Sequence, residues 1–314
     1  MARHAAREET LISIEPLSSH LGASVRGVDV SKPLDAATFG LVLKAIGDYG
    51  LLRFPGQTIT PAQQRDFAAH FGHTQAIRGR LAIFTAPGVP EINILSNIKE
   101  NGQPIGATDA GVIWHTDMVH NETPGFANVL YALKVPRRDG RVLGGTEFYN
   151  LQAAYEDLPD DIKARLTDAY GVYTGENYTS IERTPFPEYG TNSHKAHKKE
   201  PVRHRIIATH PISGRKTLYC DPGHVDYIEG LPPGERDEML QYLLKHIMQP
   251  KFHFVYDWCE GDVMMWDNLR TVHHAVLDFG PEEHRLIWRC QVEGDKVFDA
   301  AFVRQALSQA RAAA

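Results

Sequence analysis

Residues 261–276 read GDVMMWDNLRTVHHAV, and the fold prediction starts from the pattern of this stretch. A short apolar run comes first, turn-forming polar residues follow, and the stretch then leads into two adjacent histidines. Short apolar runs bounded by turn signals are typical of buried β-strands. We therefore expect a strand at DVMMW and a strand-like run that leads into His273 and His274.

Segments of the same kind recur along the chain on both sides of this stretch. From residue 91 onward the other strand-like runs are EINIL, GVIWHTD, FANVLYAL, RIIATHP, TLYC, KFHFVYDW and RLIWRCQV. The N-terminal part adds strand patterns at 10–15, 24–30 and 51–54. Helical patterns are expected at 35–50, 61–72, 150–170 and 233–248. Strands in runs with segregated helices predict a mainly β protein with flanking helices, a double-stranded β-helix of the jelly-roll, cupin-like kind.

No Pro/Gly/Ser-rich linker divides the chain, so residues 1–314 are expected to form a single domain. The segment 175–205 is polar, contains proline and lacks periodicity, and such a long irregular segment is either a surface loop or an active-site lid. An Ala-rich tail ends the sequence.

Bulk composition excludes several classes of protein. The formal net charge of -6 does not indicate a nucleic-acid-binding surface. Three cysteines without metal-type spacing argue against a disulfide scaffold and fit a reducing compartment. No apolar run has the length of a signal peptide or of a membrane span, so we expect a cytoplasmic protein without a membrane partner.

The segment Trp114-His115-Thr116-Asp117 closes one of the strand-like runs. On an extended strand, residues i and i+2 project from the same face, so His115 and Asp117 can reach one metal ion. A third ligand is available from the distant His273, because strands far apart in sequence pair across a jelly roll. Two imidazoles and a carboxylate form the facial set typical of non-haem iron(II), with other metal positions left open. His274, one residue along, should point to the opposite face.

Taken together, several motifs in order make the sequence similar to the taurine dioxygenase and 2,4-dichlorophenoxyacetate dioxygenase (TauD/TfdA) family. The matching stretches are GASVRGVDVSKPLD, GLLRFPGQTITPAQQRDFAAHFG, WHTD, GGTEFYNLQAAYEDLP, THPISGRKTLY, WDNLRTVHHAV and HRLIWR. The resemblance covers nearly the whole chain. It implies a dioxygenase that depends on Fe(II), with 2-oxoglutarate and O2 as cosubstrates, and that releases succinate and CO2.

The family pattern assigns roles to individual residues. It places the distal iron ligand on His273, with His115 and Asp117 as the other metal-binding and catalytic residues, and 2-oxoglutarate on Thr146 and Arg285. An arginine offers a planar fork for the far carboxylate of 2-oxoglutarate, although a surface ion pair with Glu282 or Glu283 is the alternative for Arg285.

The prime substrate should meet Arg289, with Met118 as a second candidate contact. Arg285 and Arg289 are separated by an even number of residues, so both can point into one barrel mouth. The resemblance therefore implies a small anionic substrate, a carboxylate, sulfonate or sulfate ester, whose hydroxylation can lead to cleavage of a carbon–heteroatom bond. The substrate-binding His and Asn of taurine-type enzymes are replaced by Ile77 and Gly111, which predicts a less polar pocket.

Two other functions are compatible with the same residues. One is a metal-binding jelly roll that senses small molecules without oxygenase activity, although a sensor would not need Thr146 and Arg285. The other is a zinc hydrolase, although the WHTD segment contains no glutamate to act as general base. A halogenating enzyme would need an open position where Asp117 stands. The family also implies a homo-oligomer, a dimer or a tetramer.

Overall fold

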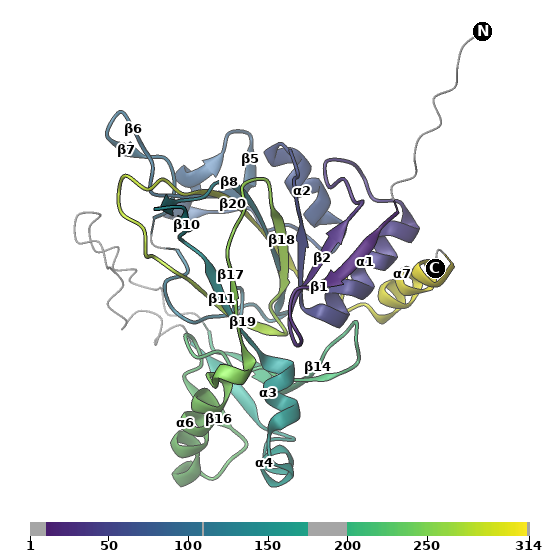
Figure 1. Cartoon of the computed structure of the whole chain (residues 1–314). Coiled ribbons are helices and arrows are strands. Elements are labelled where there is room, and N and C mark those ends of the chain that lie inside the picture. The colour runs from purple at the N-terminus through teal and green to yellow at the C-terminus, as the bar shows by residue number, and fades with distance from the viewer. Residues whose placement is uncertain (1–10, 109, 175–199, 313–314) are drawn as a thin grey trace.

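The computed structural model describes residues 11–108, 110–174 and 200–312. Two β-sheets face each other in the upper part of the molecule, and a mixed lobe of helices and short strands lies below them (Figure 1). None of the helices within these ranges has the length and apolar character that a membrane span requires.

The larger sheet has eight strands and contains most of the predicted N-terminal and C-terminal strands. Its order is β1 (Ser13–Pro16), β2 (Ala23–Arg26), β3 (Leu51–Phe54), β18 (Val263–Asp267), β8 (Gly125–Lys134), β20 (Leu286–Glu293), β5 (Val89–Ser96) and β4 (Thr85–Ala86). Neighbours are antiparallel except β2 and β3. The strand predicted at DVMMW is therefore confirmed as β18, next to the sheet centre.

The smaller sheet closes the barrel. Its strands are β17 (His253–Tyr256), β11 (Thr146–Asn150) and β19 (Thr271–Ala275), with β11 in the middle. Buried side chains from both sheets form one apolar cluster between them, including Leu130, Phe148, Trp266 and Ile287. Two facing antiparallel sheets with a shared core are the predicted jelly roll, so the fold class is confirmed.

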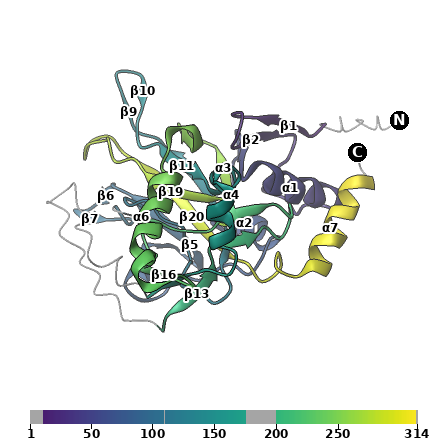
Figure 2. The same cartoon turned by 90° about the horizontal axis from the view of Figure 1, so that it is seen from below.

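Helices cover the outer face of the larger sheet (Figure 2). Helix α1 (Ala36–Tyr49) begins with the Asp35 carboxylate accepting a hydrogen bond from the backbone N–H of Thr38. Helix α2 (Pro61–Ala69) begins with a capping box between Thr60 and Gln63, and ends short of the predicted residue 72. Both predicted helices exist because their apolar faces pack on the sheet.

The C-terminal Ala-rich stretch is a helix and not only a tail. Helix α7 (Ala300–Ala312) lies beside α1 (Figure 2). The two backbones meet at Gly40, where an added Cβ would lie 2.4 Å from the carbonyl oxygen of Ala306. A small residue at this point allows the close approach, which the composition of the tail did not reveal.

The lower lobe consists of short elements around a second apolar core. Its strands are β12 (Tyr170–Tyr173), β13 (Val202–Arg205), β16 (Tyr227–Glu229), β14 (Ile207–Thr209) and β15 (Lys216–Leu218). Its helices are α3 (Leu151–Asp157), α4 (Asp160–Arg165) and α6 (Arg236–Ile247). The helical pattern at 150–170 is therefore split, because Pro159 separates α3 from α4.

Short hairpins and 3-10 turns complete the described elements. They are β6 (Lys99–Glu100) with β7 (Gln103–Pro104), β9 (Arg137–Arg138) with β10 (Arg141–Val142), η1 (Gly79–Phe84), η3 (Pro233–Glu235) and η4 (Pro250–Phe252). Of the predicted loop or lid at 175–205, residues 175–199 lie outside the described ranges, and β13 occupies the end. The single-domain expectation and the lid stay predictions.

The prediction of a strand at GVIWHTD is wrong. Residues 111–118 form turns and bends, with one isolated antiparallel bridge between His115 and His273. Gly111 and Met118 have φ values of 80° and 61°, in the left-handed region that an extended strand does not use. The two predicted ligands on this segment are therefore placed by an irregular loop.

Candidate metal centre

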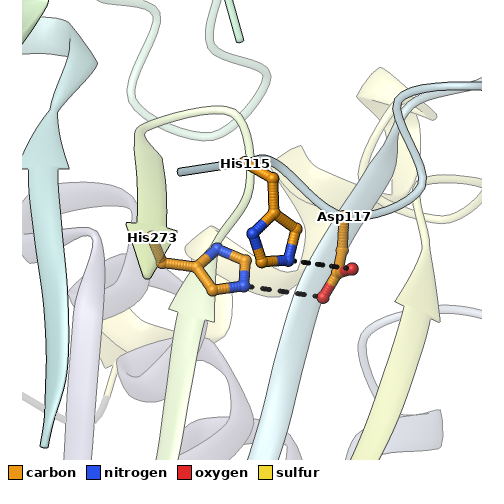
Figure 3. A group of neighbouring side chains, drawn as sticks. All are labelled: His115, Asp117 and His273. Atoms are coloured by element: carbon orange, nitrogen blue, oxygen red, sulfur yellow. Dashed lines mark ion pairs between the residues drawn. The ribbon is translucent and has the colours of Figure 1, made fainter. Parts of the chain in front are cut away.

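Three predicted ligands converge in the barrel (Figure 3). His115 and Asp117 come from the loop 111–118, and His273 comes from strand β19. The Nε2 atoms of the two histidines lie 3.6 Å from opposite oxygens of Asp117. One potential ligand atom from each residue lies within 4.8 Å of the others. Within the described part of the chain, these three residues form a group that could hold a metal ion.

The ring of His115 is oriented by a backbone hydrogen bond. Its Nδ1 lies 2.7 Å from the carbonyl oxygen of Ile113, which can only accept. Nδ1 must therefore carry a proton, which leaves Nε2, the nitrogen that faces Asp117, to bind a metal ion. A metal-binding histidine usually donates its second ring N–H in this way.

The charge state of the group suits a cation. Burial would raise the pKa of Asp117, but the positive charge of Arg289 and the two histidines hold that pKa well below its usual range. Burial and the neighbouring His115 lower the pKa of His273 well below the ordinary value. Burial disfavours charge on His115 too, yet the hydrogen bond and charge of Asp117 raise its pKa. A bound cation would displace that proton, because metal ligands are deprotonated.

Arg285 is a buried guanidinium that has no counter-ion among the described residues. It is 6% exposed, its Nε has no hydrogen-bond partner among the described residues, and burial lowers its pKa to about 10. The surface ion pair considered as its alternative is absent from the described residues, because Glu283 pairs with Arg138 instead. An unpaired buried cation is costly, so this site favours an anionic ligand.

Thr146 is buried on β11, and its hydroxyl accepts a hydrogen bond from Trp258 Nε1 at 3.0 Å. Gly144, two residues earlier, has a φ of 67°, and an added Cβ would lie 3.1 Å from Cδ of Arg285. The glycines before Thr146 therefore allow the arginine stem to pass close to this strand.

Arg289 lies between the metal centre and a cavity. Its Nη1 is 3.5 Å from Asp117 Oδ2, its Nη2 is 3.4 Å from Asn93 Oδ1, and its Nε has no hydrogen-bond partner among the described residues. Both distances are at the long limit of hydrogen bonding, so these contacts leave capacity for a stronger anionic partner.

The cavity beside Arg289 has a volume of about 460 Å³. Ile77 and Leu81 contribute apolar surface, while Gln75 and Gln291 contribute polar groups. Ile77 lines the cavity beside Arg289, and its neighbours make this cavity more polar than Ile77 and Gly111 alone suggest.

Other predicted residues have distinct positions. Met118 has its side chain over Gly125 and is not among the residues that line the cavity, so its role as a substrate contact stays a prediction. His274 stacks on Trp114 and lies 3.3 Å from Glu147, outside the group of three ligands. The expectation that His274 points away from His273 therefore fits the geometry.

The sequence did not reveal several residues next to this centre. Asp221 hydrogen-bonds the backbone of Thr116, Asn93 approaches Arg289, and Trp258 donates to Thr146. The spacing Asp-Pro-Gly-His at 221–224 is a turn signal, but nothing in it shows which part of the chain the turn contacts.

The chain is similar to several known proteins. The family model described as "Taurine catabolism dioxygenase TauD, TfdA family" matches residues 13–291. Pentalenolactone F synthase from Streptomyces avermitilis is 33% identical over 290 residues, covering 86% of this chain and 90% of the relative. The (S)-phenoxypropionate/alpha-ketoglutarate-dioxygenase of Sphingobium herbicidovorans is 28% identical, covering 92% of this chain and 97% of the relative.

A solved structure extends the comparison to three dimensions. The crystal structure of AAD-2 in complex with Mn(II) and N-oxalylglycine has a TM-score of 0.71 and 29% sequence identity. The match covers 90% of this chain and 98% of that chain.

Proposed function

Since this chain belongs to the TauD, TfdA family of dioxygenases, we propose that His115, Asp117 and His273 hold a catalytic iron(II) ion. The protein is a 2-oxoglutarate (alpha-ketoglutarate)-dependent dioxygenase that acts on a small organic anion. The observation that supports the iron site best is the convergence of two imidazoles and one carboxylate, all buried or nearly so. This donor set suits iron(II) and leaves positions for 2-oxoglutarate and O2.

We assign the recognition of 2-oxoglutarate to Arg285 and Thr146. The guanidinium of Arg285 has no protein counter-ion among the described residues, so the far carboxylate of 2-oxoglutarate can form charge-assisted hydrogen bonds with it. Because Trp258 donates to the Thr146 oxygen, the hydroxyl hydrogen of Thr146 is available to donate to the same carboxylate. When bound, the metal supplies the redox chemistry that couples O2 activation to conversion of 2-oxoglutarate into succinate and CO2.

The prime substrate is proposed to place its anionic group on Arg289 and its tail in the adjoining cavity. The weakly paired guanidinium of Arg289 lies 3.5 Å from Asp117, so an anion held there keeps a nearby carbon close to the metal centre. Gln75 and Gln291 favour a tail that carries a polar group as well as apolar surface. Hydroxylation of a carbon bonded to oxygen or sulfur then leads to cleavage of that bond.

An activity screen tests this substrate class. Wild-type protein, Fe(II) and 2-oxoglutarate are incubated with carboxylates, sulfonates, sulfate esters and phenoxyacids, and succinate release is measured. For any accepted anion, Arg289→Ala should lose activity by roughly 10- to 100-fold relative to wild type, because a charge-assisted hydrogen bond contributes about 1.5–3 kcal/mol.

The neutral amide of the same substrate is the matched control. Its weak turnover should change little in Arg289→Ala, since it offers no charge to the guanidinium. Equal losses on the acid and the amide would contradict anion recognition by Arg289, and a preference for cationic substrates would overturn the substrate class.

The alternative functions receive no support from the comparisons. A non-catalytic sensor has no counterpart among the relatives described above, and a hydrolase does not need a buried arginine beside Gly144. Chelation by EDTA followed by addition of Fe(II) or Zn(II) distinguishes the chemistries, since we expect only Fe(II) to restore succinate release.

We also propose that the protein works as a dimer or tetramer in the cytoplasm, as the family resemblance and the free cysteines suggest. Cys220, Cys259 and Cys290 are all free thiols, which fits a reducing compartment. Light scattering on the purified protein tests the assembly, and a monomer at micromolar concentration would contradict it.

A further inference from the structure

The loop 111–118 supplies two ligands although it has no regular secondary structure. Its own backbone contacts to β19 are few: His115 and His273 exchange two hydrogen bonds of 3.0 and 2.9 Å, and Ala275 N–H donates to Gly111 at 2.7 Å. These contacts hold the first half of the loop. They do not reach Asp117, which lies two residues beyond His115, the last residue of the loop that pairs with β19.

A buried carboxylate outside β19 also contacts the loop. Asp221 is 1% exposed, and its Oδ2 accepts a hydrogen bond of 3.1 Å from the backbone N–H of Thr116. Thr116 stands directly between the two ligands His115 and Asp117. The same residue donates through its Oγ1 to the carbonyl oxygen of Thr271 at 3.2 Å. Thr116 is therefore held both through its backbone and through its side chain.

The turn that carries Asp221 is itself fixed. Gly223 N–H donates to Asp221 Oδ1 at 2.7 Å, and His224 Nδ1 hydrogen-bonds Oδ2. The turn lies directly against the loop, because a Cβ on Gly223 would be 2.4 Å from the carbonyl oxygen of Trp114 and 3.3 Å from Cβ of His115. Only glycine fits between the two segments at this point.

We propose that Asp221 is a positioning residue for the metal centre. Its carboxylate fixes the backbone between His115 and Asp117, and thereby sets the distance and direction of both ligands. The proposal rests on the proposed function, namely that His115, Asp117 and His273 bind the metal. Asp221 itself is not a ligand, since its two oxygens are engaged by the N–H groups of Thr116 and Gly223 and by His224.

The chemistry of the side chain predicts a graded response to substitution. Asp221→Ala removes the acceptor for both N–H groups and leaves them buried. Asp221→Asn keeps the shape but offers one acceptor oxygen, so its NH2 group must face either the Thr116 or the Gly223 N–H. The amide variant therefore restores part of the positioning and not all of it.

Binding of Mn(II) alone, followed by the loss of the free-ion EPR signal, measures the metal centre without turnover. Residues outside the ligand set that orient ligands typically contribute 10- to 100-fold to metal affinity, and we expect roughly that loss for Asp221→Ala. For Asp221→Asn we expect a loss of roughly 2- to 10-fold, the contribution of one neutral hydrogen bond.

Asp262→Asn is the matched control. Asp262 is also 1% exposed and also accepts a backbone hydrogen bond, from Cys259, but it pairs with Arg53 and touches none of the ligands. Its substitution should lower the melting temperature and leave the Mn(II) affinity unchanged. A purely structural role for Asp221 would give the same result as this control.

The outcomes separate the two proposals. Wild-type affinity in folded Asp221→Asn and Asp221→Ala would overturn the positioning role, and if the alanine variant does not fold, wild-type affinity in the asparagine variant alone would do so. Equal Mn(II) binding by wild type and His115→Ala would instead overturn the metal site on which the proposal rests.

Discussion

The two segments that supply the proposed metal ligands are built in different ways. Strand β19 carries His273 inside a regular antiparallel sheet, paired along its length with β11. The loop 111–118 carries His115 and Asp117, has two left-handed residues and contains one isolated bridge. The strand positions its ligand by the repeating geometry of the sheet, whereas the loop depends on a few individual contacts.

The candidate metal centre therefore combines a side chain held by a regular sheet with two side chains held by a few individual contacts. The ladder of β19 distributes its constraint over many hydrogen bonds, so no single side chain on it decides where His273 points. The loop depends on the bridge to β19, on Asp221 and on the close fit at Gly125. We therefore expect substitutions near the loop to affect metal binding, and substitutions near the strand to affect folding stability.

The largest expected effect tests whether both segments are needed. His115→Ala, Asp117→Ala and His273→Ala should each reduce succinate release to background, because three facial ligands are required. His274→Ala should keep most of the Mn(II) affinity, since its ring packs on Trp114 outside the group. Loss of metal in the His274 variant with retention in the His273 variant would place the ligand one residue later on the strand.

The second-largest expected effect concerns the binding of 2-oxoglutarate to Arg285. Arg285→Ala should weaken 2-oxoglutarate binding by roughly 10- to 100-fold, the contribution of a charge-assisted hydrogen bond of about 1.5–3 kcal/mol. Anaerobic titration of the Fe(II)-loaded protein with 2-oxoglutarate measures this affinity. Arg138→Ala serves as the control, because Arg138 is exposed and pairs with Glu283. Unchanged affinity in the Arg285 variant would contradict its assignment.

A third pair of variants contrasts loop and strand directly. In Gly125→Ala, the new Cβ would lie 2.5 Å from Cβ of Met118, so the loop must shift, and we expect Mn(II) affinity to fall by about 10-fold. In Val272→Ala, a fully buried strand residue loses two methyl groups, and unfolding should require about 1.5–3 kcal/mol less.

Urea unfolding and Mn(II) titration on both proteins measure the contrast. The comparison fails if Val272→Ala weakens metal binding as much as Gly125→Ala does while both remain folded. Equal Mn(II) affinity for Gly125→Ala and wild type would show that the loop adapts to the added methyl group.

The smallest expected effect concerns Thr146, which lies on the regular strand β11. Thr146→Val should weaken 2-oxoglutarate binding by roughly 2- to 10-fold, since one neutral hydrogen bond contributes about 0.5–1.5 kcal/mol. Trp258→Phe removes the donor to the Thr146 oxygen and leaves the hydroxyl in place, so its effect should be smaller still. A larger loss for Trp258→Phe than for Thr146→Val would show that the indole contributes more than orientation.

Local patterns in the sequence were sufficient for most elements. The apolar run DVMMW is strand β18, and the caps at Asp35 and Thr60 begin α1 and α2. These features depend on residues a few positions apart, where alternation, capping and proline geometry act. The order of motifs also identified the family, because WHTD, GGTEF and WDNLRTVHHAV occur together in one chain.

Motifs in the sequence, together with the family resemblance, were sufficient to name the candidates for the metal and anion sites: His115, Asp117, His273, Thr146, Arg285 and Arg289. How these side chains are held could be learned only from the fold. It replaced the predicted strand at WHTD by a loop, left Arg285 buried without a counter-ion among the described residues, and placed Asp221 against Thr116. The reason is that such contacts join residues more than 100 positions apart, and their energies depend on burial and packing that no local pattern encodes.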